Sequence, residues 1–339
     1  MKPKEIETLK DLANYLLCDV DFLKNAIEHE FFIKDIQKPE NKFESSPSQV
    51  TVSKYYIKKK SKKGGFRTVY QSWTHQHENS LKILNSKLND IYIPNQFAHG
   101  FVKGKNIKTN ATCHLGRKLI LSVDVKNYFE SITREMIVRN LVKLGFTEQV
   151  SIWISSITTI ENCLVQGFST SPTLANIITQ ELDTSLKKVC DDEIIYTRYA
   201  DDLYFSTNNN EIPLNEITDT VEKFGFKLND KKTKFMSHGK KQYVTGLTTF
   251  DTVIPRISKR RKRNIRLEIY YLNKFGYKRH IRKKLIKLGI DPKDPDFKSL
   301  VSAEIDITMD KLYGWLHFIN SIEPDFSKKY YPKLKIAKQ

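Results

Sequence analysis

The sequence contains no closely spaced cysteine pair and no long apolar run. Its four cysteines stand far apart, which excludes a zinc module or a Cys-x-x-Cys redox motif and predicts reduced thiols. The most hydrophobic segments, Lys118–Val125 and Ile152–Ile160, are much shorter than the roughly 20 residues of a membrane-spanning helix. The N-terminus is charged and lacks the apolar core of a signal peptide. These absences predict a soluble, cytoplasmic protein with no membrane partner.

Acidic residues are also scarce relative to basic ones. The 339-residue chain has 57 lysines and arginines against 39 acids, a formal net charge of +18. The segment Arg256–Lys287 holds 14 basic residues and one acid, and Thr51–Arg67 holds seven basic residues and none. One charge run is usually a solvated surface, but two separated runs favour a phosphate polyanion as partner.

Hydrophobic periodicity predicts a chain in which strands and helices are mixed. Gln37–Gln49, rich in proline and serine, reads as a linker, and Ser171–Val189 as one long helix with Pro172 in its first turn. After Pro255 the chain is predicted to be basic and helical. The predicted strands are Val50–Ile57, Phe66–Gln71, Lys118–Val125, Ile194–Tyr199, Leu203–Thr207, Lys241–Thr249 and Thr252–Ile257.

Two adjacent aspartates, Asp201 and Asp202, separate two of these strands in a Tyr-Ala-Asp-Asp sequence. Neighbouring carboxylates repel each other, so the pair needs solvent or a cation. Taken alone, it is as consistent with a polar hairpin tip as with a metal site. Asp124, at the end of a strand expected to be buried, favours the metal site. Carboxylates from a strand and a neighbouring hairpin can hold two Mg²⁺ ions for nucleotidyl transfer, one activating a hydroxyl and one neutralising a triphosphate.

Four ordered motifs around these aspartates resemble the palm of reverse transcriptases. They are Asp124 with Phe129 five residues later, Gln166–Asn176, Tyr199–Asp202, and Gly225–Asn229 continuing through Lys232-Thr233. The similarity runs from about Lys54 to Leu247. It implies an α+β right-hand polymerase with fingers, an antiparallel-sheet palm backed by helices, and a basic helical thumb. It also implies catalytic roles for Asp124, Asp201 and Asp202, which with the Val125 carbonyl would bind two Mg²⁺ ions, Mn²⁺ being an alternative.

The resemblance implies further roles around the nucleotide. Phe129 would exclude a ribose 2′-hydroxyl, although a core phenylalanine is the commoner reading. Arg67 would contact the incoming dNTP, and Gln166 and Gly167 would border it. Lys232 would protonate pyrophosphate, with a surface lysine as the alternative.

Two further motifs narrow the family to bacterial retron reverse transcriptases. Asn110-Ala111-Thr112-Cys113-His114 matches their Asn-Ala-x-x-His motif, and Val244-Thr245-Gly246 matches their Val-Thr-Gly motif. By this resemblance Asn110, His114, Val244, Thr245 and Gly246 are expected to bind RNA. For Asn110 and His114, bracing the palm is an equal alternative.

The basic segment that follows would form the thumb. Its predicted RNA-binding residues are Lys259, Arg260, Arg261 and Arg263, with apolar positions such as Leu267, Ile269 and Leu272 packing on the protein. The expected domains are an N-terminal helical segment (1–50), fingers with part of the palm (51–115), palm with interleaved fingers helices (116–254) and thumb (255–339).

A retron enzyme copies its own structured non-coding RNA (msr-msd), starting from a guanosine 2′-hydroxyl, into multicopy single-stranded DNA (msDNA). The resemblance therefore implies the following partners: the structured RNA, its RNA–DNA product, dNTPs, a cellular ribonuclease H and a separate anti-phage effector protein. The alternatives are a reverse transcriptase of the intron or diversity-generating type, a non-catalytic RNA-binding protein with a palm fold, and a carboxylate-dependent nuclease.

Overall fold

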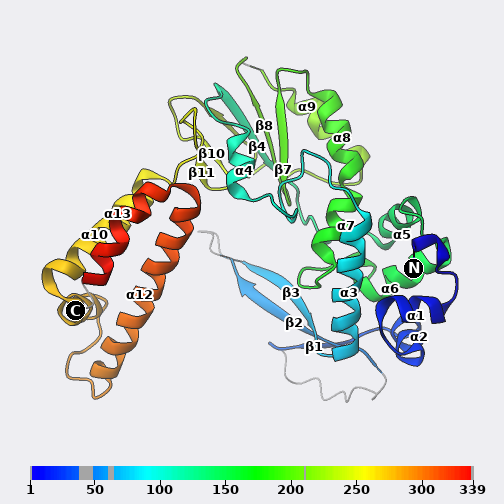
Figure 1. Cartoon of the computed structure of the whole chain (residues 1–339), viewed down its shortest axis with the longest axis horizontal. Helices are drawn as coiled ribbons and strands as arrows, with labels where there is room; N and C mark the ends of the chain where they lie inside the picture. Colours follow the sequence, from blue (N-terminus) through cyan, green and yellow to red (C-terminus); the bar gives the residue numbers. More distant parts are fainter. Residues whose placement is uncertain (1, 38–48, 60–64, 210, 337–339) are drawn as a thin grey trace. The chain divides into compact units, whose positions relative to one another are not determined.

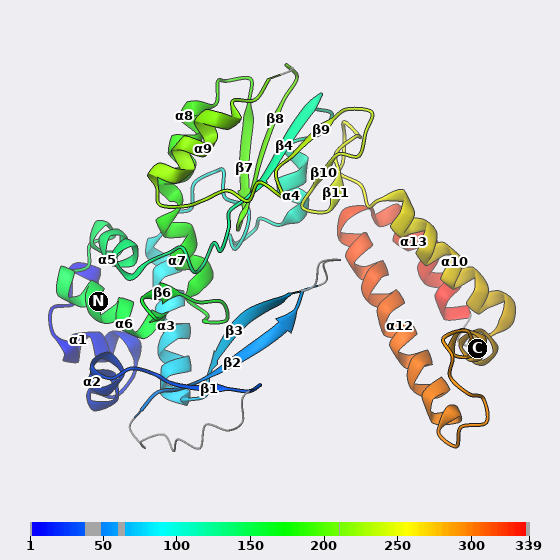
Figure 2. The same cartoon turned by 180° about the vertical axis from the view of Figure 1, so that it is seen from behind.

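A computed structural model describes residues 2–37, 49–59, 65–209 and 211–336. The chain divides into two compact units (Figures 1 and 2). Unit 1 comprises residues 1–106 and 119–235, and unit 2 comprises residues 107–118 and 236–339. The four domain ranges expected from the sequence remain predictions.

A three-stranded sheet with the order β1-β2-β3 lies in the first part of unit 1. Strand β1 (Phe32–Asp35) runs parallel to β2 (Thr51–Lys58), which pairs antiparallel with β3 (Phe66–Ser72). The two strands predicted here are confirmed to within a residue, whereas β1 was not predicted. Most of the predicted linker Gln37–Gln49, and the centre of the lysine-rich turn between β2 and β3, lie outside the described residues.

The main sheet of unit 1 has the strand order β7-β8-β4, and β9 (Lys234–Ser237), where the chain leaves the unit, continues it beside β4. Strands β4 (Leu119–Asp124), β7 (Ile195–Tyr199) and β8 (Asp202–Thr207) pair antiparallel. Almost every residue of β8 is buried because the strand is central and both of its faces are covered. This arrangement confirms the predicted strand Lys118–Val125 and the predicted hairpin around Asp201–Asp202.

Helices α8 and α9 lie along one side of this sheet (Figures 1 and 2). The helices of unit 1 are α1 (Leu9–Leu16), α2 (Val20–Glu28), α3 (His75–Ile91), α5 (Arg134–Lys143), α6 (Glu148–Thr158), α7 (Ser171–Ile178), α8 (Gln180–Val189) and α9 (Leu214–Lys223). Buried apolar side chains from these helices and from β4, β7 and β8 form one continuous core.

The prediction of one continuous helix over Ser171–Val189 was wrong, because the segment forms two helices, α7 and α8. Thr179 ends α7 and precedes α8, with its backbone outside the helical region (φ −86°, ψ 2°). Its hydroxyl donates to the Ala175 carbonyl oxygen at 2.7 Å, a back-bond that bends helices. Pro172 lies in the first turn of α7, as predicted.

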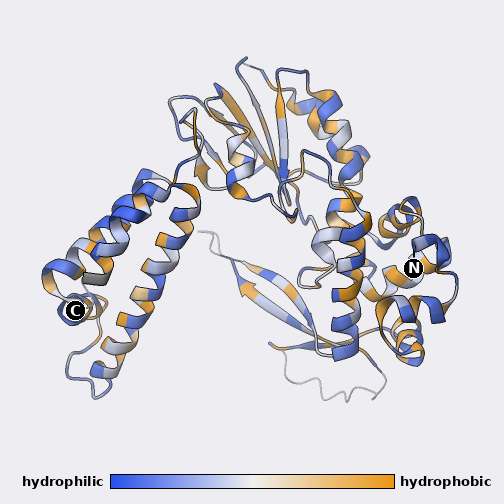
Figure 3. Ribbon diagram, viewed as in Figure 1, coloured by the Kyte–Doolittle hydropathy of each residue, from blue (hydrophilic) through white to orange (hydrophobic). Residues whose placement is uncertain are grey.

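Unit 2 contains α4 (Ile107–Thr112), a short hairpin and a group of four helices. The hairpin strands are β10 (Tyr243–Val244) and β11 (Leu247–Thr248), and the helices are α10 (Lys259–Phe275), α11 (Tyr277–Lys287), α12 (Phe297–Ile322) and α13 (Pro324–Ile336). Hydrophilic residues dominate the ribbon of α10 (Figure 3). None of the described helices is long and apolar enough to cross a membrane.

Three sequence predictions in unit 2 need correction. Lys241–Thr249 is not one strand, because Thr245 and Gly246 turn the chain between β10 and β11. Thr252–Ile257 is not a strand, because Asp251 accepts hydrogen bonds from the N–H groups of Val253 and Ile254 and turns the chain. Leu267 is 41% exposed and so does not pack into the protein, whereas Ile269 and Leu272 are buried as predicted.

Candidate active site

Three aspartates meet where two antiparallel strands end. Asp124 is the last residue of β4 and pairs in register with Asp202, the first residue of β8. Asp201 lies in the turn before it, and the Val125 N–H donates to the Asp201 carbonyl oxygen at 2.9 Å. The sheet therefore brings Asp124 close to the adjacent pair Asp201 and Asp202, which lies far from it in the sequence.

The turn that carries Asp201, Tyr199–Asp202, has an unusual backbone, and we call it the Asp-Asp turn. Ala200 adopts a left-handed conformation with φ of 56°, which residues other than glycine seldom adopt. The backbone of Gly100 packs directly on it: a Cβ atom at Gly100 would lie 2.5 Å from the Ala200 nitrogen. Strained backbone of this kind persists only where its surroundings hold it, and it is common at functional sites.

The carboxyl groups perturb one another electrostatically. Burial, followed by the charges of Asp201 and Asp124, raises the pKa of Asp202 to about 7. The pKa of Asp201 is raised chiefly by burial, with Asp124 adding to the rise and Lys232 and Arg67 opposing it. The site is thus short of positive charge and would gain from a bound cation.

One cation of the protein already contacts this centre. The Lys232 ammonium group lies 2.5 Å from Asp124 Oδ1. The sequence placed Lys232 near pyrophosphate; here it neutralises a carboxylate, with 59% of its side chain exposed. Such an exposed ammonium can exchange its carboxylate partner for a phosphate oxygen.

The donor set fits a divalent metal in its chemistry. Carboxylate oxygens are hard ligands that Mg²⁺ and Mn²⁺ prefer. Among the described residues, however, no three acidic, histidine or cysteine side chains converge closely enough to enclose an ion. Asp124, Asp201 and Asp202 would therefore have to reorient toward one another to hold one.

Phe129 lies in a cluster of aromatic rings. It follows the buried Tyr128, with their ring centroids 5.4 Å apart, and its ring centroid is 6.5 Å from that of Phe101. Phe129 is only partly buried and packs against the core. Part of the ring is therefore packed against the core, and part of it remains accessible.

Arg67 and the Gln166-Gly167 pair come from different parts of unit 1. Arg67 is an exposed residue of β3, opposite Ile57 of β2. The Gln166 carbonyl oxygen accepts from the Tyr70 N–H at 2.7 Å, which ties β3 to this segment. Gly167 has φ of 114°, and a Cβ atom there would lie 2.0 Å from the Tyr70 oxygen. In the structure, the absence of a side chain at Gly167 therefore allows its backbone to approach that of β3 closely.

Sequence reasoning missed Asn229 as a contact of the acidic centre. Its N–H donates to the Asp124 carbonyl oxygen at 2.8 Å, and its side-chain amide lies 3.4 Å from Asp124 Oδ2. Leu228 forms an isolated antiparallel bridge with Val125. The signal was present, since Asn229 belongs to the fourth motif, but its contact with Asp124 depends on the fold.

Unit 2 brings the two retron-type motifs together. The hairpin β10–β11 packs on α4, and the Thr245 hydroxyl donates to the Ile107 carbonyl oxygen at 3.0 Å. Thr245 and Gly246, both with positive φ, form the hairpin turn, while Val244 is buried. Asn110 and His114 are fully buried, which favours the bracing alternative over direct contact with RNA.

The predicted thumb residues lie in the first turns of α10. Lys259, Arg260, Arg261 and Arg263 are exposed. The Arg261 guanidinium stacks over the Trp315 ring at 4.1 Å from its centroid. The next residue, Lys262, instead forms an ion pair with the buried Glu323 at 2.8 Å. One position of this basic run therefore anchors the helix and the rest face solvent.

Comparison with known proteins identifies the family. The sequence model of reverse transcriptases (RNA-dependent DNA polymerases) matches residues 57–272. The retron Ec73 reverse transcriptase of Escherichia coli is 30% identical over 299 residues, covering 81% of this chain and 86% of that protein. The Escherichia coli retron Ec86 reverse transcriptase is 29% identical over 226 residues, covering 64% and 69%. The Myxococcus xanthus retron Mx65 reverse transcriptase is 34% identical over 179 residues, covering 46% and 42%.

The chain thus belongs to the reverse transcriptases, and its relatives place it among those of bacterial retrons. It is an RNA-directed DNA polymerase, and RNA is its template. Enzymes with this domain depend on divalent metal ions. The predicted α+β right-hand polymerase fold is confirmed. Among solved structures, apo telomerase of Candida tropicalis aligns with 87% of this chain and with 63% of the telomerase chain. The sequence identity is 14% and the TM-score is 0.47.

Proposed function

We propose that this enzyme copies a structured non-coding RNA of its own retron into msDNA, starting from a guanosine 2′-hydroxyl. The observation that carries the proposal is the pairing of Asp124 with Asp202 beside the Asp-Asp turn, in a chain whose relatives are retron reverse transcriptases. Nucleotidyl transfer requires such carboxylates to neutralise charge at the reacting phosphate.

Asp124, Asp201, Asp202 and the Val125 carbonyl would hold two Mg²⁺ ions. When bound, these ions would activate the priming hydroxyl and neutralise the triphosphate. The protein's own contribution is to hold the three carboxylates on adjoining strands and a turn, where Asp202 has its raised pKa. Lys232 would pass from Asp124 to the leaving pyrophosphate and supply a proton.

The nucleotide would lie between the acidic centre and the fingers strands. Arg67 would bind the triphosphate, since a planar guanidinium suits bidentate phosphate contact. Gln166 and Gly167 would border the base. The accessible part of the Phe129 ring would exclude a ribose 2′-hydroxyl and so select dNTPs over ribonucleotides.

RNA would be held by the exposed basic residues of α10 and by the β10–β11 turn. Lys259, Arg260, Arg261 and Arg263 would contact phosphates, which position RNA without reading its bases. Thr245 and Gly246 would contact RNA through the exposed turn, while Asn110, His114 and Val244 support it from the interior. The other partners would be a cellular ribonuclease H and a separate effector protein of an anti-phage system in the cytoplasm.

The test is a synthesis reaction with purified protein, the structured RNA encoded beside its gene, dNTPs and Mg²⁺. The expected product is DNA that stays covalently attached to RNA and is released by a 2′,5′-debranching enzyme. An Asp201→Asn, Asp202→Asn variant should bind the RNA and incorporate nothing. DNA synthesis by that variant would refute the site, and a product unaffected by debranching would refute priming from a 2′-hydroxyl.

A further inference from the structure

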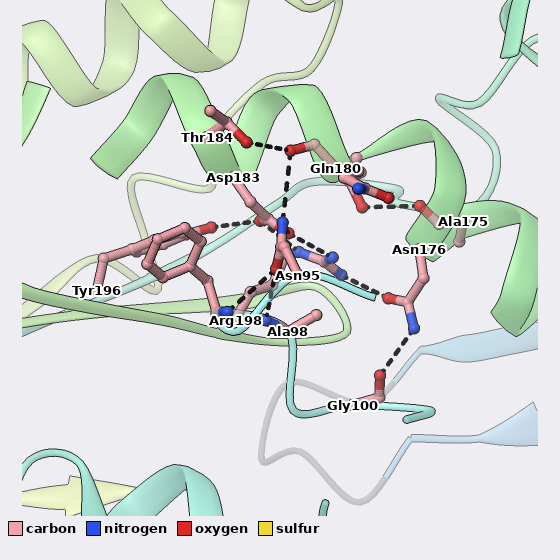
Figure 4. A network of polar contacts seen from close by, with 12 residues as sticks. Asn95, Ala98, Gly100, Ala175, Asn176, Gln180, Asp183, Thr184, Tyr196 and Arg198 are labelled. Carbon is pink, nitrogen blue, oxygen red and sulfur yellow. Dashed lines mark hydrogen bonds and ion pairs between the residues drawn. The ribbon is translucent and has the colours of Figure 1, made fainter. Parts of the chain in front are cut away.

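Arg198, the residue before the Asp-Asp turn, belongs to a fully buried ion pair (Figure 4). Arg198 of β7 and Asp183 of α8 have no exposed side-chain surface, and Arg198 Nε lies 2.7 Å from Asp183 Oδ1. Arg198 Nη2 donates to Asp183 Oδ2 at 2.8 Å, and the Tyr196 hydroxyl donates to Oδ1 at 2.7 Å. The carboxylate is therefore almost completely satisfied, which a buried charge requires.

The same pair organises the loop formed by residues 95–101. The Asn95 amide donates to Asp183 Oδ2 at 3.0 Å, while its oxygen accepts from the N–H groups of Phe97 and Ala98. The loop then runs beside β7: the Arg198 N–H donates to the Phe97 carbonyl oxygen, and the His99 N–H donates to that of Arg198. The 95–101 loop is thus held at both its backbone and its first side chain.

Asn176 of α7 joins the ion pair to the end of this loop. Its Oδ1 accepts from Arg198 Nη1 at 2.9 Å, and its Nδ2 donates to the Gly100 carbonyl oxygen at 2.9 Å (Figure 4). The donor on one side and the acceptor on the other leave the amide one orientation. Asn176 is 1% exposed, so no solvent competes for either bond.

The loop end touches both functional elements of the site. The Gly100 backbone lies against Ala200 so closely that no side chain fits between them. The next residue, Phe101, has φ of 59° and meets the Phe129 ring. Arg198 Nη1 also donates to the hydroxyl of Tyr128, which precedes Phe129, at 3.2 Å. A shift of Gly100 would therefore be transmitted to the aspartates and to the ring.

We propose that Asn176 is a positioning residue, which couples the buried Arg198–Asp183 pair through Gly100 to the Asp-Asp turn and to Phe129. It touches neither nucleotide nor metal, and acts by fixing where these elements stand. Catalytic groups must be held to within about 0.5 Å of their productive positions, a tolerance that a strained turn does not meet alone. The proposal rests on the proposed roles of the aspartates and Phe129.

The test is Asn176→Asp, a nearly isosteric change. The new carboxylate keeps an acceptor for Arg198, whose charge holds it ionised, but it can no longer donate to Gly100 and repels its carbonyl oxygen. The matched control is Asn140→Asp on α5. Asn140 is 5% exposed, and its Nδ2 donates to the Met136 carbonyl oxygen at 2.8 Å, so the same chemistry changes away from the site.

Single-turnover incorporation of a dNTP and of the matching ribonucleotide would be measured on an RNA template with a DNA primer. For Asn176→Asp we expect dNTP incorporation to slow by about tenfold or more, mainly in the maximal rate, because the aspartates are displaced. We also expect the preference for dNTP over ribonucleotide to fall about threefold or more. The preference is a ratio, so it does not depend on the fraction of folded enzyme. Asn140→Asp should change neither quantity more than about twofold, even if it lowers the melting temperature equally.

A second variant, Gly100→Ala, tests the same contact from the other side. It leaves Asn176, Arg198 and Asp183 intact and places a methyl group against Ala200, so it should reproduce both losses. If Asn176→Asp and Gly100→Ala both match Asn140→Asp in rate and preference, the inference is wrong. If the Asp201→Asn, Asp202→Asn variant is active, the proposed site itself is wrong, so the two failures are distinguishable.

Discussion

The two units of this enzyme treat charge in opposite ways. In unit 1 two ion pairs lie near the site: Arg198 and Asp183 are fully buried, and the mostly buried Asp124 is paired with the more exposed Lys232. In unit 2 the basic residues of α10 are mostly exposed, and only a few, such as Lys262, are fixed by an acid. The first pattern fixes positions and the second supplies attraction to a polyanion. Substitutions in unit 1 should therefore have abrupt effects, and those in unit 2 graded, salt-dependent ones.

The largest expected effect is the loss of synthesis in Asp124→Asn. Removal of one ligand from the acidic centre, which also releases Lys232, should slow primer extension on an RNA template by about a thousandfold or more. The measurement is the extension rate in excess dNTP and Mg²⁺. Asp219→Asn on α9, a position away from the acidic centre, is the control and should extend at the wild-type rate. A tenfold loss or less would place Asp124 outside the metal centre.

The next effect should appear in Phe129→Ala as a change of selectivity with a smaller change of rate. Without the ring, discrimination against ribonucleotides should fall by about tenfold to a hundredfold, the range for a single added hydroxyl in an apolar pocket. Competition between a dNTP and its ribonucleotide, read from product composition, measures this directly. Phe224→Ala removes a similarly half-buried ring. Equal selectivity in both variants would leave Phe129 with a packing role alone.

In unit 2 we expect a graded effect when Lys259, Arg260 and Arg263 are all changed to alanine. RNA affinity should fall by about tenfold, and the slope of log K against log salt should become shallower by roughly 1 for each phosphate that the protein no longer neutralises. Binding titrations at several salt concentrations give both quantities. Changing Lys298, Lys311 and Lys329, which are also exposed residues of unit 2, removes the same charge. Equal losses of affinity in the two triple variants would show that net charge, and not the α10 surface, binds RNA.

The smallest effect should be on stability. The pKa of Asp202 is raised from 3.8 to about 7 by burial and by Asp201 and Asp124. The folded state thus holds this proton more tightly than the unfolded state does, so stability is lost as pH rises between about 4 and 7. Asp202→Asn abolishes this titration, so the free energy of unfolding should fall by roughly 1–2 kcal/mol less in the variant than in the wild type over this pH range. This figure allows for partial solvent screening of the carboxyl group. Thermal unfolding in a chelator at pH 5 and pH 8 measures it, and an unchanged difference between wild type and variant would contradict the assignment.

Much of the site could be predicted because its chemistry is local in sequence. The Asp-Asp turn, the strand that ends at Asp124 and the glycine at 167 follow from alternation, turn residues and motif order. The sequence predicted only that Asp124 lies near Asp201 and Asp202. The structure added the strand register, which places Asp124 opposite Asp202.

The rest depends on contacts between distant segments. The position of Asn176 between Arg198 and Gly100 could not be predicted, because nothing in its own motif indicates either contact. The break at Thr179 could not be predicted, because apolar periodicity continues across it. The contact of Lys232 with Asp124 could not be predicted, because the two residues are 108 positions apart in the sequence.

The most direct test of the account is a count of metal ions in the complex of enzyme, RNA template, primer and a non-hydrolysable dNTP. Mn²⁺ titration followed by electron paramagnetic resonance would be applied to the wild type and to Asp124→Asn. The account predicts two tightly bound ions in the wild type and a loss of at least one in the variant. Equal numbers of ions in both proteins would contradict the central claim that Asp124, Asp201 and Asp202 form the metal centre of this polymerase.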